Sequence, residues 1–114
     1  MRDLAPSVVR QRVIIECTAP RIVQPTELSD YLTKLSTELN MRPLSEPFVY
    51  PAEEIGYGGW IHWVTSGAHI YTYNTCTPSL LTVDAYTCKP FSAQRAADFK
   101  RKYFKPIELV WKEV

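Results

Sequence analysis

Side chains that could do acid–base chemistry gather in one stretch of the chain, residues 56–88. Both histidines, His62 and His69, lie in it, and so do Asp84 and Cys88. Histidine is a common general acid or base near neutral pH, and a thiol can donate a proton to a bound ligand. A metal site is not expected, because no HxH or HExxH spacing accompanies the histidines and a third ligand would be needed.

Each of these side chains also has a purely structural interpretation. A histidine within a sheet is more often a residue whose hydrogen bonds are satisfied by its neighbours. Cys88 could be a buried thiol at the end of a strand, where it acts as a small hydrophobic group. Asp84 is either a carboxylate in a pocket or the partner of a nearby donor, and it must be paired if it is buried. The aromatic residues of the stretch could stack on an adenine ring, although strand aromatics are more often core or dimer contacts. They are Trp60, Trp63, Tyr71 and Tyr73.

Three strands must position these groups. Apolar and polar residues alternate over residues 60–65, 69–74 and 80–88, which predicts strands with a period of two. Residues 66–68 predict a tight hairpin turn. The glycine-rich residues 56–59 predict a loop, either one that lines the site or a plain connector. Alternation gives each strand one face that carries candidate groups: Trp60 with His62, His69 with Tyr71 and Tyr73, and Asp84 with Cys88.

Two helices and three further strands complete the expected fold. β-branched residues indicate the strands, and the helices show apolar residues on one face with capping side chains at the start. In chain order these elements are a strand over 12–18, a helix from an N-cap at Thr26 to Asn40, an edge strand over 48–50, a helix over 93–104 capped by Ser92 and a strand over 107–112. This order predicts an α+β fold, a two-layer α/β sandwich in which two helices cover one face of a mainly antiparallel sheet.

The composition fits a single domain, residues 1–114, in the cytoplasm. The 114 residues carry a net charge of +1, which is too balanced for a nucleic-acid or anionic-membrane surface. No apolar run reaches the roughly 18 to 20 residues of a membrane span, and no secretory segment is expected. Cys17, Cys76 and Cys88 are odd in number and lack a CxxC pair, which favours free thiols over disulfides or a zinc knuckle.

Two short sequence runs in the region of the predicted strands are informative: GAHI at residues 67–70 and DAYTC at residues 84–88. With them the central stretch resembles the small prokaryotic S-adenosylmethionine decarboxylases, which make a pyruvoyl group by cutting their own chain at a serine. That family has Glu-Ser-His, then a strand ending in His, then a strand closing with Asp-x-x-Thr-Cys. The sequence spacing between His69 and Cys88 matches the family pattern without a gap. The strands and helices on either side also follow in the family's order. The resemblance implies the same two-layer fold and a homodimer in which the sheets pair.

The chain departs from the family pattern at residues that do the family's chemistry. The self-cleaving serine corresponds to Ala68, which has no hydroxyl group, and the glutamate before it corresponds to Gly67. The processing histidine corresponds to Tyr73, whose phenol is a poor base near neutral pH. The ribose-binding glutamate corresponds to Thr77. Without a pyruvoyl group no Schiff base can form and the carbanion left by CO₂ loss has no electron sink, so no cofactor is expected.

The resemblance leaves two catalytic positions unchanged, His69 and Cys88, of which Cys88 resembles the catalytic acid. With Tyr73 they are the candidate catalytic residues. The candidate ligand-binding residues are Trp60, Tyr71, Asp84 and Thr77. A cleavage point shifted to Ser66 is a further hypothesis, and its alternative is an ordinary turn serine.

Three functions follow from the resemblance and its departures. The first is a decarboxylase-like protein without pyruvoyl that binds S-adenosylmethionine or a related nucleoside or amine, or that regulates a partner such as an active paralogue. The second is an active enzyme that consumes S-adenosylmethionine, either an unprocessed decarboxylase of polyamine synthesis or a lyase that needs no cofactor. The third is a protein-interaction module, because a fold does not fix a function.

Overall fold

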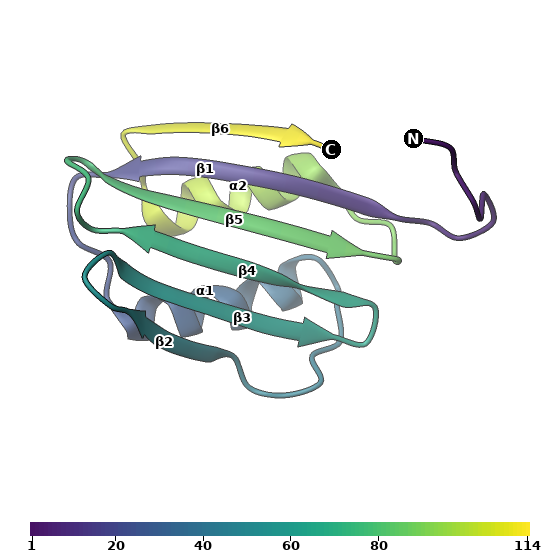
Figure 1. Cartoon of the computed structure of the whole chain (residues 1–114), viewed down its shortest axis with the longest axis horizontal. Coiled ribbons are helices and arrows are strands. Elements are labelled where there is room, and N and C mark those ends of the chain that lie inside the picture. Colours follow the sequence, from purple (N-terminus) through teal and green to yellow (C-terminus); the bar gives the residue numbers. More distant parts are fainter.

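Six strands form one antiparallel sheet in the order β2-β3-β4-β5-β1-β6, with two helices against it (Figure 1). The computed structural model describes residues 1–114. The elements are β1 (Gln11–Ala19), α1 (Pro25–Glu38), β2 (Phe48–Ala52), β3 (Gly56–Trp63), β4 (Ser66–Tyr73), β5 (Ser79–Thr87), α2 (Ala93–Phe104) and β6 (Glu108–Glu113). Strands β2 to β5 are neighbours in chain order, whereas β1 lies between β5 and β6.

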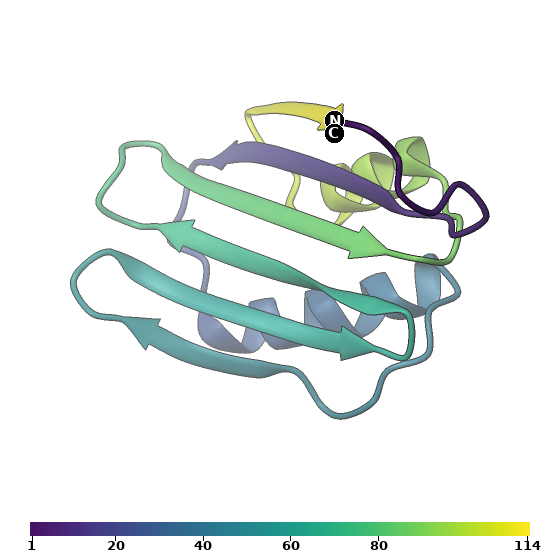
Figure 2. The same ribbon diagram turned by 45° about the vertical axis from the view of Figure 1, so that its right-hand side comes forward.

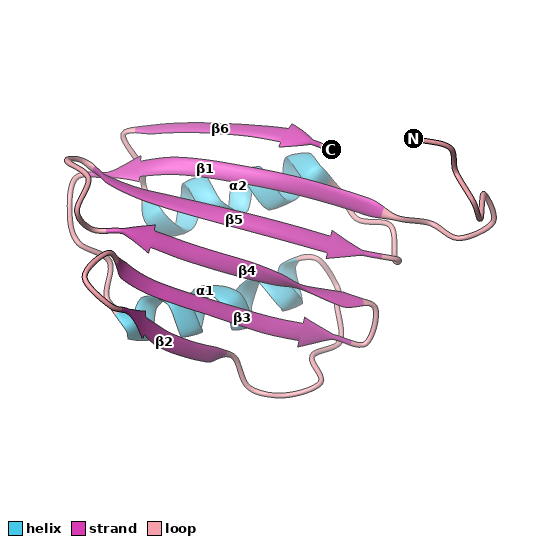
Figure 3. Cartoon of the chain, viewed as in Figure 1, coloured by secondary structure: helices cyan, strands magenta, loops and turns pink.

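Both helices lie on the same side of the sheet and leave the other face bare (Figures 2 and 3). Helix α1 packs against β2 and β3, α2 packs against β1 and β6, and the helices contact each other. The expected α+β fold, with two helices on one face of an antiparallel sheet, is confirmed. Neither helix has the length and apolar character needed to cross a bilayer.

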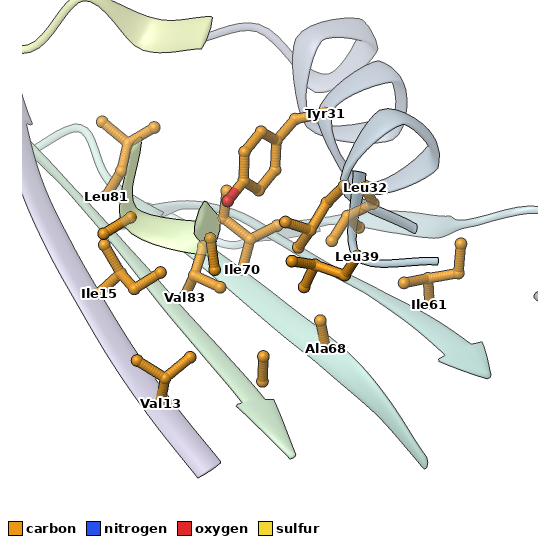
Figure 4. Close-up of a cluster of buried hydrophobic side chains, with 14 of the residues drawn as sticks. Val13, Ile15, Tyr31, Leu32, Leu39, Ile61, Ala68, Ile70, Leu81 and Val83 are labelled. Atoms are coloured by element: carbon orange, nitrogen blue, oxygen red, sulfur yellow. The ribbon is translucent and has the colours of Figure 1, made fainter. Parts of the chain in front are cut away.

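Alternating residues of the central strands form the core beneath the helices (Figure 4). Its members include Val13, Ile15, Ala68, Ile70, Leu81 and Val83 of the sheet and Tyr31, Leu32 and Leu39 of the α1 segment. Trp63 also belongs to the core, where it is 1% exposed and its indole N–H donates to Ser36 Oγ at 2.7 Å. Trp63 is therefore not part of a stacking platform, because alternation places it on the face opposite Trp60.

Two predicted boundaries around β3 are wrong. Residues 56–59 are not a loop but the first half of β3. Gly58 lies under a tyrosine ring of β2, which a Cβ atom would approach to 2.6 Å, so the missing side chain serves strand pairing rather than a turn. The turn between β3 and β4 lies at residues 64–65 rather than 66–68. Ser66 follows this turn with a φ of 144°, a value that residues with a side chain rarely adopt.

The start of α1 also differs from the prediction. Its N-cap is Gln24 rather than Thr26, because Pro25 takes the first helical position. The carboxylate of Glu27 reaches back and accepts the Gln24 N–H at 2.7 Å, which satisfies one of the free donors at this helix end. The cap of α2 is Ser92, as predicted.

A buried lysine joins α2 to the centre of the sheet. Lys100 is 0% exposed, and its Nζ donates to the carbonyl oxygens of Ile15 at 2.7 Å and Leu81 at 3.0 Å. Burial lowers the pKa of Lys100 to about 8, although Cys17 and Glu16 act in the opposite direction. These two hydrogen bonds fix α2 over the boundary between β1 and β5.

Candidate functional site

The bare face of the sheet carries a row of side chains that lie opposite one another on neighbouring strands. From the β2 edge inward, the row is Phe48, Trp60, His69, Asp84 and Ile14. The rings of Phe48 and Trp60 stack with their centroids 5.6 Å apart. The row therefore runs from an aromatic end to a charged centre.

The next row of residues across the same face lacks a side chain at one position, and this leaves a hollow in the surface. The residues in register there are His62, Gly67, Tyr86 and Arg12, and Gly67 has no side chain to fill the space between His62 and Tyr86. The hollow has a volume of about 440 Å³, within the range of roughly 300–1,000 Å³ typical of small-molecule sites. It is lined by Arg12, His62, Ser66, Gly67, His69, Asp84 and Tyr86.

A bidentate ion pair holds the carboxylate of the hollow. Nε and Nη2 of Arg12 donate to the two carboxylate oxygens of Asp84 at 2.9 and 2.8 Å. The side chains are 41% and 39% exposed, so solvent and ligands can reach both charges. The hydrogen bonds to Asp84 raise the pKa of Arg12. Asp84 is thus both a hollow-lining carboxylate and the partner of a donor, while Nη1 of Arg12 remains available for an anionic group.

Both histidines face the solvent beside aromatic rings. The ring of His62 lies 4.3 Å from that of Trp60, and the ring of His69 is parallel to that of Tyr71 at 6.3 Å. Both imidazoles are exposed, so they are not sheet histidines enclosed by their neighbours. Burial, followed by the neighbouring Tyr50 phenol, raises the pKa of Tyr71, which therefore stays a neutral hydrogen-bond donor. This arrangement can stack on a ring, donate hydrogen bonds and exchange a proton.

Comparison with known proteins assigns the family. The model of the family described as S-adenosylmethionine decarboxylase matches residues 13–114. The chain belongs to the S-adenosylmethionine decarboxylase family. The crystal structure of the adenosylmethionine decarboxylase from Aquifex aeolicus VF5 has a similar fold, with a TM-score of 0.76 and 21% identity over 94% of this chain and 89% of that chain. No curated protein sequence matches the chain. The resemblance expected from the runs at 67–70 and 84–88 is confirmed.

Ala68, which the resemblance led us to expect at the position of the decarboxylases' cleavage serine, lies in the core. Ala68 is 1% exposed, and its methyl group lies among the apolar side chains under the helices (Figure 4). At Gly67, where the resemblance implies a glutamate in the family, a Cβ atom would come within 2.5 Å of the Ile61 carbonyl oxygen. Neither position presents a hydroxyl or a carboxylate group to the hollow.

The structure brings most of the predicted ligand-binding and catalytic residues to one face. Trp60, His69, Tyr71 and Asp84 lie within two neighbouring rows of it. Tyr73 shares the face but lies at the far end of β4, opposite Leu80.

Cys88 and Thr77 lie at opposite ends of β5. Cys88 follows the strand at the end where the hollow lies, and its N–H donates to the Thr65 carbonyl oxygen at 3.0 Å. Its thiol is exposed, so the interpretation as a buried hydrophobic group is wrong. Thr77 precedes β5 and lines a separate small hollow of about 170 Å³. The structure therefore does not bring Thr77 together with His69.

Sequence reasoning missed two members of the site, Arg12 and Phe48. Arg12 stands opposite Tyr86, one row from Asp84, and only the pairing of β1 with β5 brings the two charges together. Phe48 was expected in an edge strand, and its stacking partner Trp60 becomes evident once β2 is aligned with β3. No group of three or more His, Cys, Asp or Glu side chains is arranged to hold a metal ion.

Proposed function

We propose that this member of the S-adenosylmethionine decarboxylase family does not cut its own chain and does not form a pyruvoyl group. The observation that carries the proposal is the core position of Ala68, whose methyl group has no hydroxyl to attack the preceding carbonyl and lies buried under the helices. Gly67 and Tyr73 stand where the family has a glutamate and a processing histidine. Without pyruvoyl, decarboxylation lacks its electron sink, so the proposed role of the protein is binding.

The proposed ligand is S-adenosylmethionine or a related nucleoside or amine. Trp60 and Phe48 offer ring faces on which an adenine can stack. His69 lies between these rings and Asp84 and can donate hydrogen bonds to ribose oxygens. The ion pair offers a carboxylate to an amine and, through Arg12, a guanidinium to a carboxylate. An adenosyl group with an amino-acid tail therefore matches the order of side chains along the row.

In this proposal the chain is a single domain that acts in the cytoplasm as a homodimer. Pairing of the sheets, as in the family, would cover apolar surface on the bare face, where Phe48 is 55% and Tyr86 is 46% exposed. It would also shield the hollow from water and strengthen its electrostatic contacts. An active paralogue is the partner we propose for a regulatory role.

Titration calorimetry with S-adenosylmethionine and with methylthioadenosine tests the ligand proposal. We expect both to bind and Trp60→Ala to weaken binding about tenfold or more, since stacking contributes roughly 1–3 kcal/mol. Asp84→Asn should weaken binding of S-adenosylmethionine more than that of methylthioadenosine, which lacks the amino-acid tail. Trp111→Ala, which removes a partly exposed tryptophan outside the hollow, is the matched control. No heat with either nucleoside would contradict the proposal and favour an interaction module.

A second candidate is an enzyme that consumes S-adenosylmethionine without a cofactor. The exposed imidazoles of His62 and His69 at the hollow favour it, because such a group can take a proton from an activated carbon. Chromatography of S-adenosylmethionine after incubation with the protein separates the candidates. New products that vanish in His69→Ala would support a lyase, and an unchanged ligand would support binding alone.

A further inference from the structure

The C-terminal strand β6 presents an open hydrogen-bonding edge. It pairs with β1 on one side and has no strand on the other. The N–H of Val114 donates to the Arg12 carbonyl oxygen at 3.0 Å, and hydrogen-bonded positions recur at every second residue of an antiparallel pair. The even-numbered residues of β6 therefore bond to β1, and the backbone groups of Leu109, Trp111 and Glu113 point to the open side.

This edge has no proline to block pairing with another strand. The opposite edge, β2, contains Pro51, which cannot donate to a ladder, whereas β6 contains no proline. β6 also exposes apolar surface, with Val110 56% and Trp111 37% exposed. Its charged residues on the bare face, Glu108 and Lys112, have opposite signs, so they do not by themselves repel a second copy of the strand.

We propose that β6 pairs with β6 of a second copy around a two-fold axis at Val110, which continues the sheet from one chain into the other. This register places Glu108 opposite Lys112 of the second copy, and the symmetry repeats the contact. On the helix side it places Leu109 opposite Trp111. A shift of the axis by one residue in either direction would set Val110 opposite Glu108 or Lys112 and leave the charges unmatched. The sequence of the strand is therefore self-complementary in one register.

The backbone agrees with this register. Leu109 and Trp111 carry the open N–H and C=O groups, and they would form the hydrogen-bonded pairs across the axis. Val110 would face its own counterpart in a non-hydrogen-bonded pair, where side chains approach most closely. The β6 contact lies along the edge of the sheet and leaves the row from Phe48 to Asp84 uncovered. The proposed pairing therefore does not depend on whether the proposed ligand binds.

Disulfide trapping tests the register directly. In a Cys76→Ser, Cys88→Ser background, we expect Val110→Cys to form a covalent dimer on mild oxidation, because Cβ atoms in such a pair lie roughly 4.5–5.5 Å apart. Glu108→Cys is the matched control, since its thiols would be separated by four residues of strand, about 13 Å. An equimolar mixture of Glu108→Cys and Lys112→Cys should again cross-link. Trapping of Val110→Cys no faster than Glu108→Cys would overturn the proposal.

Charge exchange supplies a second measurement, by sedimentation of the chain with its natural cysteines. Glu108→Lys and Lys112→Glu should each weaken the edge-to-edge association through β6 about tenfold, because both charge pairs become repulsive. The variant with both substitutions should restore it. Lys102→Glu, an exposed substitution on α2, is the control that should have no effect. A chain that stays monomeric at all concentrations, or a double variant as weak as the single ones, would contradict the pairing.

Discussion

At the scale of single residues, Lys100 shows how burial and charge compete in this fold. Its ammonium group is enclosed between α2 and the sheet, and burial lowers its pKa from 10.5 to about 8. Between these pH values the unfolded chain binds more protons at this lysine than the folded chain does. The cost of burying the charged form is therefore fully present below pH 8 and is lost as the pH rises towards 10.5. The difference between the two pKa values corresponds to about 3 kcal/mol in the free energy of unfolding.

We therefore expect the free energy of unfolding of the wild type to rise relative to that of Lys100→Met as the pH increases from 8 to 10. Methionine keeps most of the volume of the side chain but cannot become charged. Burial raises the pKa of Cys17, which lowers the free energy of unfolding as the pH rises. This effect is present in both the wild type and Lys100→Met. Urea denaturation across this pH range gives the difference, which should change by up to about 3 kcal/mol. A difference that stays constant with pH would contradict the assignment.

At the scale of elements, local patterns predicted the strands and helices but not all of their boundaries. Alternation identified β4 and β5, because a period of two is visible in the sequence itself. The glycines of β3 resemble a loop in sequence, although Gly58 lies under a ring of the neighbouring strand. The pairing of Arg12 with Asp84 joins positions 72 residues apart, and no local pattern reports which strands become neighbours. The side-chain types that line the hollow were evident from the sequence, but the pairing of their charges was not.

The β3–β4 hairpin offers a test of the close backbone approach at Gly67. Gly67→Ala should destabilise the fold by about 1–3 kcal/mol, because the new Cβ atom would meet the Ile61 carbonyl oxygen at 2.5 Å and the backbone must move. Gly59→Ala is the matched control. Its Cβ atom would lie 3.2 Å from a methyl group of Val49, which can rotate away. Chemical denaturation gives the free energy of unfolding of both variants, and a loss for Gly67→Ala no larger than that for Gly59→Ala would contradict the prediction.

At the scale of the whole molecule, the two faces of the sheet carry different kinds of side chain. The helices bury one face and with it Ala68, while the other face keeps aromatic, imidazole and charged groups exposed. The family's fold is thus retained, while the replacement of the groups that would cut the chain is our proposal. Ala68→Ser alone should not produce cleavage, because the new hydroxyl group would lie in apolar surroundings, and Gly67 and Tyr73 supply neither a carboxylate nor an imidazole.

The intact mass of freshly purified wild-type protein tests the central proposal most directly. We expect one species with the 13.1 kDa of the uncut chain, and the same for Ala68→Ser apart from the added oxygen. Two fragments from the wild type, with a keto-acyl group at the start of the second, would show that the chain does process itself. A cut before Ser66 instead of residue 68 would be recognised by the fragment masses and would equally contradict a protein without pyruvoyl.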